Sequence, residues 1–100
     1  MASPDPALAV IDALGARDLL DLVAGVCRAH GVTLDEVCGR QRTQAVSWAR
    51  HEAWWRLRHH PGRHYSLAEI GRLFGRDHTT VRHGIELHDR RSALVAGRAG

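Results

Sequence analysis

Residues 66–81 read SLAEIGRLFGRDHTTV, a segment that contains two helix starts separated by one short turn. Ser66 and Glu69 have the spacing of a capping box, in which the hydroxyl and the carboxylate each accept a backbone N–H at the helix start. Gly75 permits a tight turn, and Asp77 can cap a second helix that starts directly after it. Two helices joined by a short turn that contains glycine predict a helix-turn-helix unit.

Helix caps, glycine stops and apolar residues at three- and four-residue steps also divide the rest of the chain, and no strand-like alternation competes with them. Asp5 and Pro6 provide a cap followed by proline at the first helical position, and Gly15 ends this first apolar segment. Thr33 and Glu36 form a second capping box. These signals predict an all-α fold, a small domain of about five to six helices, over residues 7–14, 18–30, 33–38, 43–58, 66–74 and 78–91.

Length and composition suit one domain. A chain of 100 residues buries roughly 65% of its unfolded surface, and 44% hydrophobic with 25% charged residues is close to globular averages. No uncharged apolar run approaches the ~18 residues of a membrane span, and residues 1–6 do not resemble a signal peptide, so we expect a cytoplasmic protein. We expect an N-terminal extension with a short helix (residues 1–17), a helix-turn-helix domain (residues 18–94) and a flexible tail (residues 95–100).

Charge is divided unevenly along the chain. Residues 1–39 carry two arginines against six acidic residues, whereas residues 40–100 carry twelve arginines against five. All fourteen basic residues are arginine, whose planar fork suits phosphate and guanine, although a GC-rich genome would produce the same bias. An arginine-rich half is typical of a nucleic-acid-binding surface, and it is also compatible with a solvated face.

The start of the last helix separates into an inner and an outer set of side chains. Val81 and Ile85 lie one turn apart and can pack on Ile70 and Phe74 of the preceding helix. The outer set offers hydrogen-bond donors, acceptors and a methyl group, which are the groups needed to read base edges and thymine methyls. A solvated, well-capped helix start is the alternative interpretation. The outer set consists of Asp77, His78, Thr79, Arg82 and His83.

Residues 74–81, FGRDHTTV, together with SLAEIG at 66–71, closely resemble the signature of the C-terminal DNA-binding domain of the bacterial replication initiator DnaA. The likeness extends back through Arg50 and the basic loop at residues 39–42 to about Leu19. This resemblance implies an all-helical domain that reads a short asymmetric duplex site, the DnaA box. In that family a helix-turn-helix lies in the major groove, and an arginine of the basic loop enters the minor groove.

The resemblance also assigns roles to individual residues. Asp77, His78 and Thr79 match the base-reading positions in the major groove. Arg42, or as the alternative Arg40, matches the minor-groove arginine. Arg50, Thr80 and His83 match positions that hold phosphates. Apart from the resemblance, phosphate contacts are also expected from Arg63, Arg76 and Arg82. We expect no cofactor and no nucleotide.

Five positions depart from the resembled pattern. Polar Glu52 and Arg56 stand where the family usually has apolar residues, and Trp54 stands where a smaller apolar residue is usual. Gly84 replaces an alanine-like position, and Arg82 also stands where an apolar residue is usual. The middle helix is therefore expected to pack differently here, and the DNA sequence that is read is expected to change more than the fold.

No GxxxxGK[ST] phosphate-binding loop occurs in the sequence, so we expect a free-standing reading domain without the ATPase module of the initiator. The predicted function is that of a transcriptional regulator, of the kind found in phage-like or mobile gene clusters, that binds double-stranded DNA at the nucleoid. Its protein partners would be RNA polymerase or replication proteins. A modulator of replication initiation that acts at DnaA boxes is the alternative function of the same class.

Three functions of other classes compete with DNA binding. A protein-interaction module could use Trp48, Trp54 and Trp55 as an aromatic anchor. The alternative interpretation is that Trp48 and Trp55 pack against the N-terminal helices. The eight histidines and the two cysteines show no metal-ligand spacing, and we expect Cys27 and Cys38 to be reduced core thiols. No paired carboxylates or nucleophile–base arrangement supports an enzyme, so no catalytic residue is expected.

Overall fold

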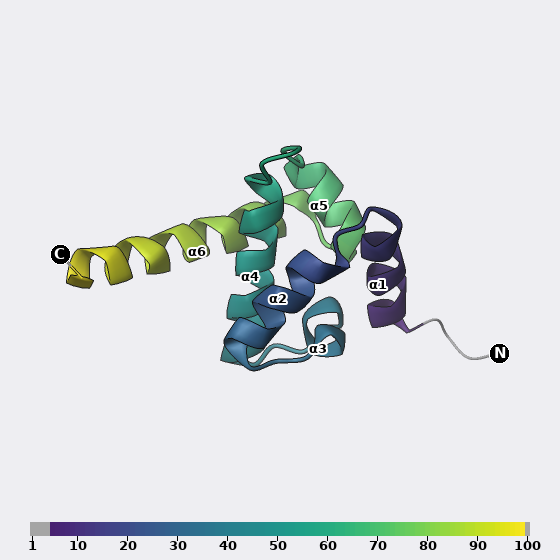
Figure 1. The fold of residues 1–100 in the computed structure, drawn as a ribbon, viewed down its shortest axis with the longest axis horizontal. Helices are drawn as coiled ribbons and strands as arrows, with labels where there is room; N and C mark the ends of the chain where they lie inside the picture. The colour runs from purple at the N-terminus through teal and green to yellow at the C-terminus, as the bar shows by residue number, and fades with distance from the viewer. Residues whose placement is uncertain (1–4, 100) are drawn as a thin grey trace.

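A computed structural model describes residues 5–99, and this range contains six helices and no strand. The all-α prediction is confirmed. No helix in this range is both long and apolar enough to cross a membrane. The helices are α1 (Pro6–Ala16), α2 (Leu20–His30), α3 (Leu34–Cys38), α4 (Gln44–Arg58), α5 (Leu67–Phe74) and α6 (His78–Ala99), and Figure 1 shows their arrangement.

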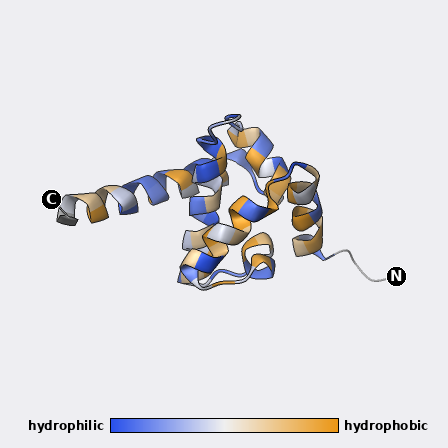
Figure 2. Cartoon of the chain, viewed as in Figure 1, coloured by the Kyte–Doolittle hydropathy of each residue, from blue (hydrophilic) through white to orange (hydrophobic). Residues whose placement is uncertain are grey.

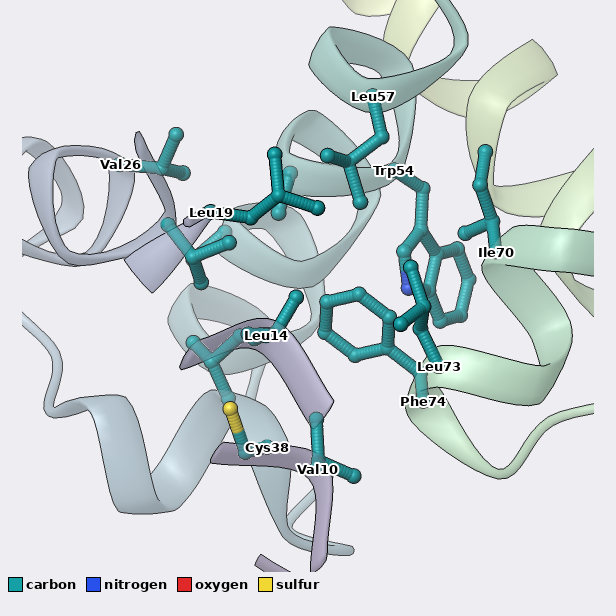
Figure 3. Close-up of a cluster of buried hydrophobic side chains, with 14 of the residues drawn as sticks. Val10, Leu14, Leu19, Val26, Cys38, Trp54, Leu57, Ile70, Leu73 and Phe74 are labelled. Carbon is teal, nitrogen blue, oxygen red and sulfur yellow. The ribbon is translucent and has the colours of Figure 1, made fainter. Parts of the chain in front are cut away.

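Helix α4 occupies the centre of the domain, where α2, α3, α5 and α6 all pack against it (Figure 1). Helix α1 lies against α3 and α5, and the far half of α6 projects away from the other helices. The core is shared by the helices: Figure 3 shows Leu14 of α1, Trp54 of α4 and Phe74 of α5 turned towards one another. Because α1 buries three side chains in this core, it packs as part of the same unit as the helix-turn-helix.

Local capping determines where these helices begin. The hydroxyl of Ser66 accepts the Glu69 N–H at 3.0 Å, and the Glu69 carboxylate accepts the Ser66 N–H at 2.9 Å. Thr33 and Glu36 make the same reciprocal pair at 2.8 and 3.1 Å. Both predicted capping boxes are therefore confirmed, and Gly75 adopts the left-handed conformation (φ 65°) that the turn between α5 and α6 requires.

Three boundaries differ from the prediction. Helix α1 continues through Gly15 to Ala16, because a glycine inside a helix weakens it without ending it. Helix α2 starts at Leu20, since Asp18 is in the left-handed region (φ 60°) and cannot belong to a right-handed helix. Helix α6 continues to Ala99, beyond the expected end near Arg91, so residues 95–99 are helical where we expected a flexible tail. The division of the chain into extension, domain and tail stays a prediction.

Polar residues of α4 account for part of its departure from the family pattern. Glu52 accepts a hydrogen bond from Arg56 at 2.8 Å and lies 2.9 Å from the His30 ring nitrogen on α2.

The two cysteines belong to the core as expected, since both are buried and free. Burial raises the pKa of the Cys38 thiol to about 12, which keeps it protonated and unreactive.

The three tryptophans do not form one anchor. Trp54 is only 2% exposed and lies inside the core. The sequence suggested that Trp48 and Trp55 pack against the N-terminal helices, but their partners Asp89 and Arg91 lie on α6. The Trp55 indole N–H donates to Asp89 at 2.8 Å, and the Arg91 guanidinium lies 4.6 Å from the Trp48 ring centre. Trp48 is 39% exposed and is the only one of the three that presents a large apolar surface.

Trp54 fits against a glycine of α6. A Cβ atom added at Gly84 would lie 2.7 Å from two carbon atoms of the Trp54 ring and 2.7 Å from Cδ2 of His51. Real Cβ atoms do not approach other atoms this closely, so the bulky ring at position 54 requires the missing side chain at position 84. The tryptophan at position 54 and the glycine at position 84, which both depart from the family pattern, therefore belong to one packing arrangement.

His51 gives the fold a dependence on pH. Its Nδ1 lies 3.2 Å from a guanidinium nitrogen of Arg91, which can only donate, so the ring accepts and is neutral. Burial, together with the nearby charges of Arg91 and Arg50, lowers the pKa of His51 from 6.5 to about 4. Between these two values the unfolded chain takes up a proton that the folded chain does not, so the free energy of unfolding should fall as the pH falls from about 6.5 to about 4.

Urea titrations at pH 7, 5.5 and 4.5 would measure this effect. His51→Gln should reduce the slope in this window, while the part due to His88, whose pKa is also lowered by burial, remains. The exposed His64→Gln is the matched control and should leave the slope unchanged. Carboxylates with a lowered pKa, such as those of Glu52 and Asp77, act in a lower pH range and contribute equally to all three proteins. Equal slopes for wild type and His51→Gln would disprove the assignment.

Candidate nucleic-acid interface

The first two turns of α6 expose the outer set that the sequence predicted. Val81 and Ile85 are buried against α5, whereas the side chains of Asp77, His78, Thr79, Thr80, Arg82 and His83 are all exposed. The helix start therefore presents acceptors, donors, a methyl group and positive charge on a single exposed edge.

Hydrogen bonds arrange Asp77 and Thr79 before any ligand binds. One carboxylate oxygen of Asp77 accepts the Thr79 N–H at 2.8 Å and the Thr79 hydroxyl at 2.7 Å. These bonds lower the pKa of Asp77, so the cap is ionised at neutral pH. His78 stands beside it, with Nδ1 3.5 Å from the same oxygen. Because the Thr79 hydroxyl is already engaged, its methyl group is the part of the side chain left for an apolar contact.

The basic loop, residues 39–42, adjoins the turn of the helix-turn-helix unit. Arg76 of that turn donates from Nη2 to the Gly39 carbonyl at 2.9 Å. Burial lowers the pKa of Arg76, and the nearby charges of Arg40 and Arg42 lower it further. Both loop arginines are exposed. The structure thus brings the expected minor-groove residues close to the start of the expected major-groove helix.

Arg50 is placed differently from the expectation. Its side chain is 5% exposed and lies inside the domain. Nε donates to the Val37 carbonyl at 2.9 Å, and Nη2 lies within 3.2 Å of the carbonyls of Glu36, Gly39 and Gln41. Burial lowers its pKa to about 10, so the guanidinium is still charged at pH 7. Arg50 therefore holds the backbone of α3 and the basic loop from within, and a direct phosphate contact does not fit this placement.

Two further arginines expected to bind phosphate are paired with carboxylates. Arg63 forms an ion pair with Glu69 and lies 4.4 Å from the Tyr65 ring centre. It belongs to the hydrophilic loop between α4 and α5, at the opposite end of α4 from the basic loop (Figures 1 and 2). Arg82 lies 3.8 Å from Glu86 and is well exposed. The structure consequently does not bring Arg63 together with the other candidates, whereas Arg82 lies on the exposed edge of α6.

Arg72 is a candidate that the sequence reasoning missed. It is exposed near the end of α5, and with Arg40 and Arg76 it lines a hollow of about 200 Å³ beside α1. The available signal was its charge at an outward position of the first helix of the unit. Among residues 5–99, no three side chains of histidine, cysteine, aspartate or glutamate are gathered as metal ligands would be.

Comparisons with known proteins agree with this geometry. A family model described as "Bacterial dnaA protein helix-turn-helix" matches residues 21–87. The chain is 40% identical over 79 residues to the chromosomal replication initiator protein DnaA of Thermomicrobium roseum, and the match covers 75% of this chain and 17% of that protein. It is also 40% identical over 62 residues to the protein of the same name from Leifsonia xyli subsp. xyli, covering 61% and 13%. The chain thus spans less than a fifth of the length of these relatives. No solved structure matches it significantly.

Proposed function

Because this chain belongs to the bacterial DnaA helix-turn-helix family, we propose that it reads a short DnaA-box-like duplex site and thereby regulates transcription. The chain is a DNA-binding domain. The observation that supports the finer proposal is the hydrogen-bonded contact between the basic loop and the turn before α6, which places two arginines beside the exposed helix start. A major-groove helix and a minor-groove arm on one face are the parts needed to read a short asymmetric site.

In this proposal some residues contact bases and others contact phosphates. Asp77, His78 and the Thr79 methyl group contact base edges, while Arg42, with Arg40 as the alternative, enters the minor groove, where narrow A·T-rich tracts concentrate negative potential. Phosphates are held by Thr80, Arg82 and His83, with Arg72 as an additional candidate. Because these 100 residues contain no GxxxxGK[ST] phosphate-binding loop, we expect this chain to bind DNA independently of nucleotide.

Selection of bound duplexes from a random pool tests the proposal. We expect one short site without two-fold symmetry, bound equally well with and without ATP and magnesium. The affinity should fall steeply with salt, with a contribution of about −0.9 to the slope of log K against log salt for each phosphate neutralised. Recovery of no preferred sequence, together with a flat salt response, would refute it and favour the protein-interaction module.

A reporter gene that carries the selected site separates the two functions of this class. A transcriptional regulator, with RNA polymerase as its partner at the nucleoid, changes expression from that reporter. A modulator of replication instead competes with an initiator on origin DNA and leaves the reporter unchanged.

Thr79→Ala is expected to reduce specificity and to leave general affinity intact. Loss of one base contact costs on the order of 1–3 kcal/mol on the cognate site and little on other duplexes. The ratio of specific to non-specific affinity should therefore shrink about 5- to 150-fold, measured by fluorescence anisotropy on cognate and scrambled duplexes. Arg82→Ala is the matched control, because loss of a phosphate contact weakens both duplexes alike. If Thr79→Ala kept full discrimination, the major-groove assignment would be wrong.

A further inference from the structure

We propose that Arg76 is a positioning residue, which holds the basic loop at a set distance from the start of α6 and so keeps the minor-groove and major-groove contacts in register. The inference rests on the proposed reading of duplex DNA. It replaces the phosphate contact that the sequence indicated for Arg76. Its basis is the 2.9 Å hydrogen bond from Nη2 to the Gly39 carbonyl, which joins two segments 37 positions apart in the chain.

The Gly39 carbonyl accepts from two arginines at once. Arg76 reaches it from the helix-turn-helix turn, and Arg50 reaches it from the interior at 3.2 Å. Arg50 also holds the Gln41 carbonyl at 3.0 Å. Loop residues whose carbonyls are held thus alternate with the exposed arginines at positions 40 and 42. Fixing positions 39 and 41 determines where the two intervening guanidinium groups can go.

Arg76 is itself tied firmly to α5. Its backbone N–H donates to the Gly71 carbonyl at 2.8 Å, and its side chain is half-buried. A continuous connection therefore runs from the α5 backbone through the Arg76 side chain to the loop. Because the next residue of the chain is the Asp77 cap of α6, the same short turn sets the position of the reading helix and of the loop.

The Arg76 side chain lies near the like charges of Arg40 and Arg42, so its placement is due to its hydrogen bond and not to favourable charge interactions. The charges of Arg40 and Arg42 disfavour the charged form of Arg76. The two loop arginines are exposed, so water and salt screen them, whereas the Arg76 guanidinium is directed to a carbonyl oxygen in a half-buried place. A side chain that served only to hold phosphate would not need this buried partner.

A double-mutant cycle on DNA tests the proposal. Affinities of wild type, Arg76→Ala, Arg42→Ala and the double variant are measured on the selected site and on the same site with its A·T-rich flank replaced by G·C pairs. We expect each single variant to lose about tenfold in discrimination between the flanks, and the double variant to lose little more, because residues that act through one another are not additive. Discrimination of the core against a scrambled core should be retained in Arg76→Ala.

Other outcomes overturn the positioning role. An equal loss on all duplexes, with a salt slope lower by about 1, would make Arg76 an ordinary phosphate contact, as expected for the control Arg82→Ala. An equal loss that follows a lower melting temperature would make its role purely structural.

Backbone ¹⁵N relaxation without DNA keeps the test independent of the proposed function, because an order parameter reports the motion of an exposed loop residue directly. The order parameters of residues 40–42 should be lower in Arg76→Ala than in wild type, while those of the α4 interior stay unchanged. Unchanged order parameters in the loop would overturn the positioning role even if the domain reads DNA as proposed. If the wild-type protein showed no sequence preference, that result would contradict the proposed function alone.

Discussion

Replacing Arg50 by alanine should destabilise the domain by about 3–5 kcal/mol, a large part of the roughly 5–15 kcal/mol by which a domain is stable. The variant removes a charged donor that satisfies four backbone carbonyls between α3 and the basic loop. Each buried carbonyl left without a partner costs about 1–3 kcal/mol, and water can reach only the part-buried ones. Urea unfolding followed by circular dichroism measures the change.

The control for Arg50→Ala is Arg63→Ala, which removes an exposed guanidinium paired with Glu69 and should cost less than about 1 kcal/mol. Arg50→Lys should also be strongly destabilised, because one ammonium group cannot reproduce the planar fork that reaches several carbonyls. A stable Arg50→Ala protein whose only defect is a lower salt slope on DNA would restore the phosphate contact that the family resemblance implied.

Gly71→Ala should be the second most damaging of these changes, with a loss of about 2–3 kcal/mol. An added Cβ would lie 2.5 Å from the Arg76 carbonyl oxygen. This oxygen belongs to the backbone of the turn, so no side-chain rotation can relieve the contact, and the turn itself has to move. The start of α6 moves with it, so specific binding to DNA should decrease together with stability.

Gly25→Ala is the matched comparison within the same chain. Its added Cβ would meet only a guanidinium nitrogen of Arg28 at 3.7 Å, which is ordinary contact. Alanine is a better helix former than glycine by about 1 kcal/mol, so this variant should be slightly more stable than wild type. Thermal melts of the two variants decide the matter: a stabilised Gly71→Ala would show that the turn is not packed against α5.

Local interactions made much of this fold predictable. Both capping boxes, the left-handed Gly75 and the inward pair Val81 and Ile85 depend on residues only a few positions apart, and each was found as predicted. The partners of Trp48 and Trp55 depend on how α6 crosses α4, which no short segment specifies. The sequence therefore indicated that these rings pack, and it misidentified the helix they pack against.

At Arg50, helical periodicity indicates burial correctly, but the charge of the residue and the family resemblance led to the opposite prediction. Arg50 follows Val46 by four positions and precedes Trp54 by four, so helical periodicity places it on the buried face of α4. Its charge and the family resemblance pointed outwards instead. The carbonyls that make its burial favourable come from α3 and from the basic loop, and their convergence is a tertiary feature that periodicity does not reveal.

The close fit of Trp54 against Gly84 constrains the history of the domain. A smaller residue at position 54 with alanine at 84, and tryptophan with glycine, are two solutions for the same space. Descent through single substitutions favours one order between them, because tryptophan arriving first would meet the alanine methyl group at 2.7 Å. Glycine arriving first costs only about 1 kcal/mol of helix stability. Position 84 is therefore a permissive site, and the order that packing favours is glycine at 84 before the large ring at 54.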